Sequence, residues 1–392
     1  MRILLVAPSI EPGKSGVGDY ALSLAGELSR LGQTVALIGL ADETDQIKRT
    51  SPSETIRSLA LPQTLPWPER QQACRDFCRD FQPDWISLQF VCYAFDPRGL
   101  VWNLGSRLRS WGGGASWHVM FHEIWVGAKM DASWKQRLLG RLQRASIQWS
   151  IRALKPRAVH TSNETYRSLL ARAGIPAGIQ PMFGSIPFLP PSDDSALETL
   201  LARHGPVPGG TAPRLQELWI GLFGSLHPIW PPEPFFTHLL QAEQISGRRP
   251  VLISVGRLGP GRELWERLRK DYGTRITFLE LGEQSPERIC RLFQRLDCGI
   301  ATTPYQVIGK SSSAAAMVEH GLPVIVNRTE RYGLPSDDLP HPEPLYLPMT
   351  ADLPRLLAAL PPRRAPRSLL PETARGFLNA LEETSAAPSH GL

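Results

Sequence analysis

Residues 1–40 read MRILLVAPSIEPGKSGVGDYALSLAGELSRLGQTVALIGL and contain a complete strand, loop, helix and strand. The short apolar run Ile3–Ala7 is typical of a strand that is buried on both faces. A glycine-rich loop, residues 12–18, follows it, and Tyr20–Gly32 has a helical periodicity that ends at a glycine. Val35–Leu40 is a second apolar run. This βαβ pattern predicts a parallel sheet.

The same alternation continues along the chain. In the first half we expect further strands at Asp84–Phe90, Trp117–Phe121 and Ala158–Ser162. In the second half we expect strands at Leu218–Phe223, Pro250–Val255, Arg275–Leu279, Cys298–Thr302 and Pro323–Val326. The sequence therefore predicts an α/β protein with two Rossmann-like domains, whose parallel sheets face a central cleft.

The chain has 392 residues, which is too long for one ordinary core. Prolines and glycines accumulate between the two series of strands and predict a linker. We therefore expect an N-terminal acceptor domain at 1–185, a linker at 186–213 and a C-terminal donor domain at 214–365. The remaining residues, 366–392, are expected to form a helix and a tail that can pack back on the N-terminal domain.

The composition is that of a folded globular protein, with 42% hydrophobic and 20% charged residues. A net charge of +6 suits anionic ligands such as nucleotides, or an anionic membrane surface. No zinc-finger spacing and no compact basic recognition helix is present, so we expect no nucleic-acid partner. The 5 cysteines include no CxxC pair, which favours buried thiols in a reducing compartment.

The first apolar run stops at Pro8, which is not typical of a signal peptide. No stretch approaches the roughly 18 apolar residues of a membrane span. We therefore expect a cytoplasmic protein, either free or peripheral on the inner membrane face.

The strongest local signal for chemistry lies between the strand Cys298–Thr302 and the next helix. Pro304–Ser313 reads PYQVIGKSSS, and Ser311 is a good helix N-cap. The first-turn amides of a helix favour an anion, and Lys310 and the hydroxyls of Ser311, Ser312 and Ser313 add charge and donors. The segment is nearly a P-loop, but Pro304 replaces the first glycine. We therefore predict a phosphate site rather than ATP or GTP hydrolysis.

The loop that follows the first strand is the second candidate. Gly16, Val17 and Gly18 lie where open α/β sheets bind ligands, and glycines let the backbone approach a phosphate. The glycine order differs from the G-x-G-x-x-G of dinucleotide-binding proteins. Asp42, near the end of the second strand, could be a ribose-binding acid, so an NAD-dependent oxidoreductase remains an alternative.

Polar residues also follow three other predicted strands. His122 and Glu123 come directly after Trp117–Phe121, and a neutral histidine there can bond a sugar hydroxyl. Ser225 and His227 follow the first strand of the second half, and Arg257 follows its second strand. We expect no metal at His122.

The order of these pieces resembles the GT-B glycosyltransferases, most closely the family 4 type, over about Arg2–Val326. The motifs that carry the resemblance are Gly16-Val-Gly-Asp-Tyr20, His122-Glu123, Phe278-Leu-Glu-Leu-Gly-Glu283, Asp297-Cys-Gly-Ile-Ala-Thr-Thr-Pro304 and His320-Gly-Leu-Pro-Val324.

The resemblance implies a hexosyltransferase that uses a nucleotide-diphosphate sugar as co-substrate, with retention of configuration and no other cofactor. It also implies that His122 contacts the donor sugar and that Leu281, Gly282 and Glu283 hold the base through backbone groups.

The sequence departs from the family pattern at two places. The family carries two glutamates, E-x7-E, and the matching positions here are Ile308 and Ala316. Glu319 lies one helical turn after Ala316 and is the candidate to reach the ribose instead. Ser225 and His227 also replace the family's Arg/Lys pair. These departures keep open a catalytically inactive, GT-B-like subunit that binds a sugar or a partner.

We assign catalysis to His122, Glu123 and Lys310, since sugar transfer places negative charge on the leaving diphosphate. An inverting enzyme would need a base near the acceptor, for which Asp19 or Glu123 is available. The acceptor can be a sugar, a lipid-linked compound or another small molecule.

The segment Ser133–Leu154 combines an apolar face with several arginines. Such a helix can lie at a membrane interface as a peripheral contact, or it can pack on its own core.

Overall fold

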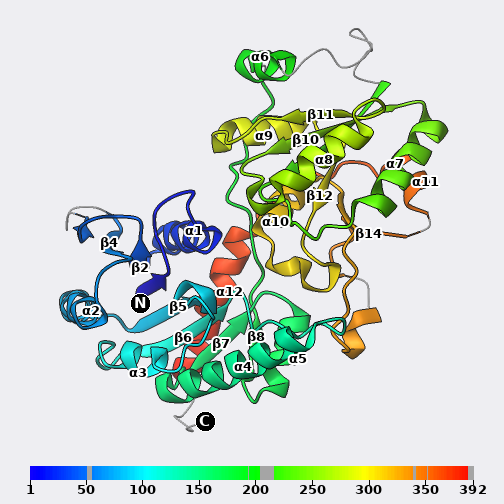
Figure 1. Ribbon diagram of the computed structural model, residues 1–392. Coiled ribbons are helices and arrows are strands. Elements are labelled where there is room, and N and C mark those ends of the chain that lie inside the picture. The colour runs from blue at the N-terminus through cyan, green and yellow to red at the C-terminus, as the bar shows by residue number, and fades with distance from the viewer. Residues whose placement is uncertain (51–54, 193, 204–215, 339–340, 351, 387–392) are drawn as a thin grey trace. The chain divides into compact units, whose positions relative to one another are not determined.

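The computed structural model describes residues 1–50, 55–192, 194–203, 216–338, 341–350 and 352–386 (Figure 1). The chain forms two compact units. The N-terminal unit comprises Met1–Met182, Arg331–Asp337 and Leu369–Leu392, and the C-terminal unit comprises Phe183–Glu330 and Asp338–Ser368. Residues 204–213 of the predicted linker lie outside the described residues.

The N-terminal unit is built on an 8-stranded sheet with the order β3-β4-β2-β1-β5-β6-β7-β8. All neighbours pair in parallel except β3, which is antiparallel to β4. The strands are β1 (Arg2–Ala7), β2 (Thr34–Asp42), β3 (Lys48–Arg49), β4 (Arg57–Pro62), β5 (Trp85–Phe90), β6 (Ser116–Phe121), β7 (Ala158–Thr161) and β8 (Gly178–Ile179).

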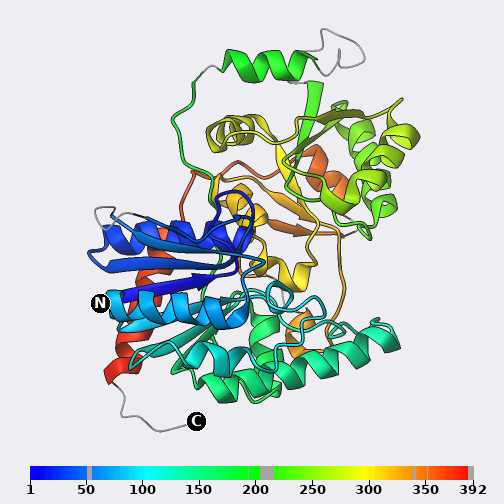
Figure 2. The ribbon, with the colours of Figure 1, turned by 60° about the vertical axis from the view of Figure 1, so that its left-hand side comes forward.

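Helices cover both faces of this sheet. Its helices are α1 (Gly16–Arg30), α2 (Trp67–Phe81), α3 (Leu104–Arg109), α4 (Trp134–Leu154), α5 (Glu164–Arg172) and α12 (Leu370–Ala386). Helices α1 and α12 pack together on one face, whereas α2, α3 and α4 lie on the other (Figures 1 and 2). This arrangement buries Ile3–Ala7 of β1 and all of β5, and the apolar run of β1 agrees with burial on both faces.

The C-terminal unit contains a 6-stranded, all-parallel sheet with the order β11-β10-β9-β12-β13-β14. Its strands are β9 (Glu217–Phe223), β10 (Arg249–Val255), β11 (Thr277–Glu280), β12 (Cys298–Ala301), β13 (Val324–Val326) and β14 (Tyr346–Pro348). Its α-helices are α6 (Ser195–Arg203), α7 (Pro232–Ser246), α8 (Arg262–Tyr272), α9 (Pro286–Arg295), α10 (Ser312–Glu319) and α11 (Leu353–Ala358).

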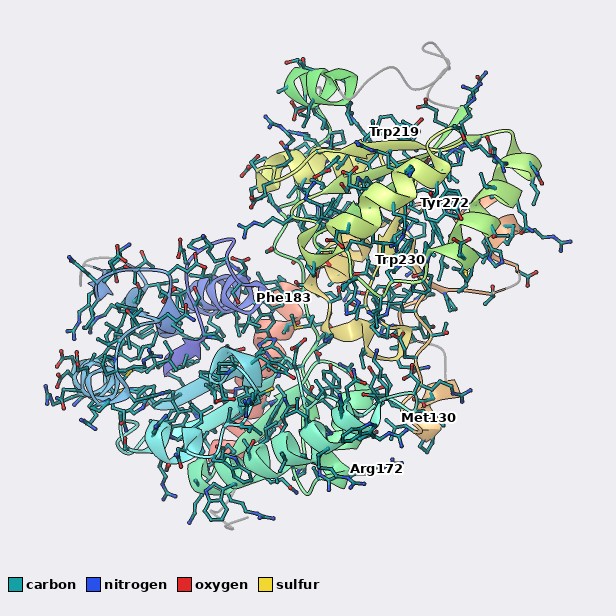
Figure 3. All side chains as sticks on the ribbon, in the orientation of Figure 1. Met130, Arg172, Phe183, Trp219, Trp230 and Tyr272 are labelled. Carbon is teal, nitrogen blue, oxygen red and sulfur yellow. The ribbon has the colours of Figure 1, made fainter. Side chains whose placement is uncertain are left out.

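An aromatic cluster fills one side of that sheet. Trp230 packs against Phe235 and Phe236, and Phe236 stacks on Tyr272 with ring centroids 4.4 Å apart (Figure 3). Short 3-10 helices occur at η1 (Cys92–Ala94), η3 (Gly259–Gly261), η4 (Tyr305–Lys310) and η5 (Pro335–Asp338).

The predicted strands are all present, with ends that shift by one or two residues. Strand β4 and the short strands β3, β8 and β14 were not expected from the sequence. All 5 cysteines are buried free thiols, as predicted. No helix among the described residues is long and apolar enough to cross a membrane, and the cytoplasmic location stays a prediction.

Candidate functional site

Three glycine turns line the carboxyl edge of the C-terminal sheet. Gly224, Gly256 and Gly282 follow the neighbouring strands β9, β10 and β11, and each has a positive φ of 64° to 95°. The amide of Gly256 donates to the carbonyl oxygen of Gly282 at 2.8 Å. A Cβ on Gly256 would lie 3.3 Å from the backbone of Gly224, so two of the turns are in direct contact. Their left-handed conformation favours glycine and brings the residues that follow close together.

Two of the predicted site residues form an ion pair at this edge. The Nε atom of Arg257 lies 2.7 Å from Oε1 of Glu283, and both side chains are exposed. An exposed pair of this kind stabilises the fold little. Its consequence is electrostatic: the Arg257 charge is already partly neutralised, and a bound diphosphate would compete with Glu283 for the guanidinium.

Helix α10 begins at the same edge. Ser311 is its N-cap, as predicted, and its Oγ accepts a hydrogen bond from the Ala314 amide at 3.2 Å. The hydroxyls of Ser311 and Ser313 lie 3.2 Å apart. A Cβ on Gly224 would come within 3.8 Å of the Ser313 Cβ, which places the first turn of α10 beside the end of β9. The turn therefore offers amide and hydroxyl donors where the glycine turns meet.

The other predicted phosphate-site residues lie in short turns and helix ends around the start of α10. The stretch before Ser311 is the 3-10 helix η4, and half-buried Lys310 is its last residue. Half-buried Ser312 opens α10. The exposed Ser225 accepts a hydrogen bond at its carbonyl oxygen from the Thr302 hydroxyl at 3.2 Å. His227 accepts from the Ile229 amide through Nδ1, which stabilises its own turn.

The predicted nucleoside-binding residues lie in two places: Leu281, Gly282 and Glu283 follow β11, and Glu319 is at the end of α10. The amide of Leu281 donates to the Ser254 carbonyl oxygen, and its own carbonyl oxygen accepts from the Gln284 side chain. Glu319 is only 3% exposed, and its Oε1 accepts from the Gly184 amide at 3.1 Å. It ends α10, about 12 Å along the axis from the N-cap. A role of either residue in nucleoside binding stays a prediction.

In the N-terminal unit, Gly16, Val17 and Gly18 form the first turn of α1 and not the predicted loop. The sequence signal that was missed is Ser15, whose side chain caps the helix by accepting from the Gly18 amide. A Cβ on Gly18 would lie 2.3 Å from the carbonyl oxygen of Ser9, so glycine is required there by close packing. The exposed helix start at Gly16 keeps its suitability for an anion.

Asp42 has a structural role that argues against the dinucleotide hypothesis. It is 2% exposed, and its Oδ1 accepts from the Ser9 hydroxyl and from the amides of Ile10 and Glu11, at 2.6 to 3.1 Å. These three donors fix the loop after β1. The expectation that Asp42 could bind a ribose was therefore wrong, because its carboxylate is held inside the fold.

His122 is at one end of a buried chain of hydrogen bonds. Its Nε2 is 2.9 Å from Oε1 of Gln89, whose amide donates to Ser87 at 2.8 Å. Ser87 Oγ lies 2.8 Å from Nδ1 of His118, and His118 Nε2 lies 3.0 Å from Nδ1 of His160. Every bond in the chain is satisfied when all three imidazoles are neutral and each group donates to the next.

Burial keeps these histidines uncharged. It lowers the pKa of His122 to about 3, and burial together with the neighbouring His160 holds the pKa of His118 well below its usual value. With its Nε2–H directed at Gln89, His122 keeps Nδ1 as a hydrogen-bond acceptor. The Tyr20 ring of α1 packs edge-on against His122, with centroids 4.9 Å apart, and Glu123 is half-buried beside it. The first turn of α1 and His122 thus belong to one region.

The hydrogen bonds that orient His122 were not predicted from the sequence. A signal for them was present: polar residues alternate within apolar strands, at Ser87 and Gln89 in β5 and at His118 in β6. Alternation with period two puts them on one face of the sheet.

The N-terminal unit also holds a cavity of about 200 Å³. It is lined by Trp67 at the start of α2, by Asp96, and by Trp102, Asn103 and Arg107 around the start of α3. The guanidinium of Arg107 lies over the Trp67 ring, 4.7 Å from its centroid. Because these residues follow β4 and β5, the cavity lies toward the carboxyl edge of the sheet.

Solved structures identify the fold. The chain is similar to sucrose-phosphate synthase from Thermosynechococcus elongatus, with a TM-score of 0.59 at 15% identity, covering 98% of this chain and 94% of that one. The catalytic domain of starch synthase IV from Arabidopsis thaliana, bound to ADP and acarbose, gives 0.58 at 12% identity, with 99% and 100% covered. Anabaena Alr3699/HepE, in complex with UDP and glucose, gives 0.51 at 14%, with 98% and 91% covered.

The chain therefore has the GT-B fold, with two Rossmann-like domains, as the sequence predicted. Residues 15–180 match the family described as the glycosyl transferase 4-like domain. That match lies within the N-terminal unit. A comparison with curated proteins finds no match.

Proposed function

We propose that this chain is a glycosyltransferase that transfers a hexose from a nucleotide-diphosphate sugar. The observation that carries the proposal is the meeting of glycine turns, Arg257 and the start of α10 at one edge of the C-terminal sheet. The glycosyl transferase 4-like domain and the GT-B fold support it. Two structures with the same fold contain ADP or UDP, which supports a nucleotide as the donor's leaving group.

The leaving diphosphate needs positive charge and aligned donors. The Ser313 hydroxyl and the first-turn amides of α10 can donate to phosphate oxygens. Arg257 and Lys310 add charge, and Arg257 becomes available when a phosphate replaces Glu283 as its partner. Fixed donors of this kind stabilise charge in the transition state without reorganisation, and this stabilisation accounts for much of the rate acceleration in many group transfers.

His122 and Glu123 act on the sugar side in this proposal. Neutral His122 accepts a hydrogen bond from a sugar hydroxyl at Nδ1, and its chain of partners prevents it from turning. The transfer retains configuration without a covalent protein nucleophile. If it inverts instead, Asp19 or Glu123 is available as the base, and Oδ1 of Asp19 accepts from the Gly13 amide at 2.8 Å.

A binding subunit without catalysis is the second candidate function. Ile308 and Ala316, which replace the family's two glutamates, are both buried. A Cβ on Gly184 would lie 2.4 Å from the Ala316 Cα, so the two backbones are packed closely at that point. Neither Ile308 nor Ala316 carries a carboxylate, so another residue must contact the nucleoside and the sugar.

Incubation with UDP-, GDP-, ADP- and dTDP-sugars, followed by mass spectrometry, tests the two functions. A transferase releases the nucleoside diphosphate slowly with water as acceptor, and Lys310→Ala reduces that release at least about tenfold. Thermal stabilisation by a nucleotide sugar with no release after prolonged incubation would support the binding subunit. Stabilisation by NADH alone would contradict both.

A further inference from the structure

Helix α4 exposes a row of large apolar side chains. Trp134 is 70% exposed, Leu138 52%, Leu142 46% and Trp149 59%. At about 100° per residue the four fall within about 80° of one another, and the row is about 22 Å long. The alternative that this face packs on the protein's own core is wrong.

The opposite side of α4 fixes the helix to the N-terminal unit. The Gln143 side chain bonds the Val126 amide, the Tyr93 hydroxyl and the Arg98 carbonyl oxygen, at 2.7 to 2.9 Å. Ser146 accepts from the Val101 amide before α3, and Ser150 accepts from the Gly105 amide in the first turn of α3. The buried residues are centred about 150° around the helix from the exposed row. The row is therefore a rigid surface that the fold does not use.

Positive charge surrounds this surface. The α4 sequence WKQRLLGRLQRASIQWSIRAL contains one lysine and four arginines, and residues 132–163 contain no aspartate or glutamate. Arg141, Arg144 and Arg152 are exposed, and Arg141 and Arg152 lie within about 60° of the row's centre. Lys135 lies over the Trp134 ring, 5.7 Å from its centroid.

We propose that this surface docks the chain on an anionic lipid bilayer. Indole rings partition to the interface between headgroups and acyl chains, and arginines beside them bond lipid phosphates. A second copy of the chain is a poorer occupant, because it would bring two surfaces of like charge together. Met130, also exposed, precedes the helix and can extend the contact (Figure 3). Docking does not depend on the proposed sugar transfer, although it favours a lipid-linked acceptor.

Flotation of the full chain with lipid vesicles tests the proposal. Vesicles of phosphatidylcholine with about a quarter phosphatidylglycerol should bind at least about tenfold more protein than phosphatidylcholine alone, and 0.5 M salt should remove most of the difference. Trp134→Ser/Trp149→Ser should lower binding at least about tenfold. The control Ile229→Ser/Ile245→Ser removes equally exposed side chains, 64% and 59%, from the C-terminal unit and should bind normally.

Circular dichroism separates folding from docking, since side chains this exposed should leave the melting temperature within about 2 °C. Absence of binding to the anionic vesicles would overturn the proposal, as would equal losses in the two double variants. A dimer by light scattering that Trp134→Ser/Trp149→Ser disperses, with no vesicle binding, would assign the surface to a second copy. Donor turnover measured on the same samples reports independently on the proposed function.

Discussion

The buried state of His122 makes the stability of the N-terminal unit depend on pH. Burial lowers the pKa of this imidazole to about 3, whereas in the unfolded chain it is about 6.5. Below pH 6.5 His122 binds a proton in the unfolded chain but not in the folded chain, so acid favours unfolding. The contribution of His122 to stability is therefore complete above about pH 7 and is lost as the pH falls toward 3.

The magnitude follows from these two values. Each pH unit below 6.5 costs about 1.4 kcal/mol, so His122 alone should destabilise the unit by about 2 kcal/mol between pH 7 and pH 5. His122→Gln removes the titration, while its amide can still donate to Gln89. The variant should therefore lose about 2 kcal/mol less than the wild type over the same range.

Urea unfolding followed by tryptophan fluorescence at pH 5, 6 and 7 measures both proteins. His118 and His160, whose pKa values are also lowered, titrate in both proteins. His122 is the smallest of the three causes that lower the pKa of His118, so most of their contribution cancels in the comparison. Equal losses of stability on acidification in the wild type and in His122→Gln would refute the reasoning. Folded His122 would then carry the proton, and its Nδ1 could not accept from a sugar hydroxyl.

Two further predictions use matched positions in the structure. Gly18→Ala should lower the stability of the N-terminal unit by about 1–3 kcal/mol, since its Cβ would meet backbone 2.3 Å away. Gly26→Ala in the same helix meets nothing within 4 Å and should stabilise the unit by up to about 1 kcal/mol. Thermal denaturation compares the two variants, and equal melting temperatures would exclude the close packing at Gly18. Ser311→Ala and Ser133→Ala each remove a helix N-cap worth about 1 kcal/mol. Calorimetry should show weaker nucleoside-diphosphate binding only for Ser311→Ala, and equal binding by both variants would separate the α10 cap from the donor site.

The strands and the start of α10 could be predicted because their signals are local. Strand β1, for example, is a continuous apolar run from Ile3 to Ala7, and Ser311 directly precedes its helix. The start of α1 was missed because Gly16 and Gly18 look like loop residues, although packing on the Ser9 carbonyl requires a glycine at Gly18.

Contacts between distant residues could not be predicted in this way. Arg257 and Glu283 are 26 positions apart and meet only because their strands are neighbours in the sheet. Asp42 looked like a ligand residue, and its burial under the loop after β1 depends on the tertiary fold. The tautomer of His122 likewise depends on Gln89, from the adjacent strand β5.

The donor site in the C-terminal unit is the central claim, and calorimetry of nucleoside diphosphates with charge variants tests it most directly. Arg257→Gln should weaken the binding of the preferred diphosphate about tenfold, and Glu283→Gln should strengthen it severalfold by removing the competing carboxylate. Arg269→Gln, which removes an arginine paired with Glu266 on α8, should bind as the wild type does. Unchanged affinity in both Arg257→Gln and Glu283→Gln, or no diphosphate binding at all, would contradict the claim.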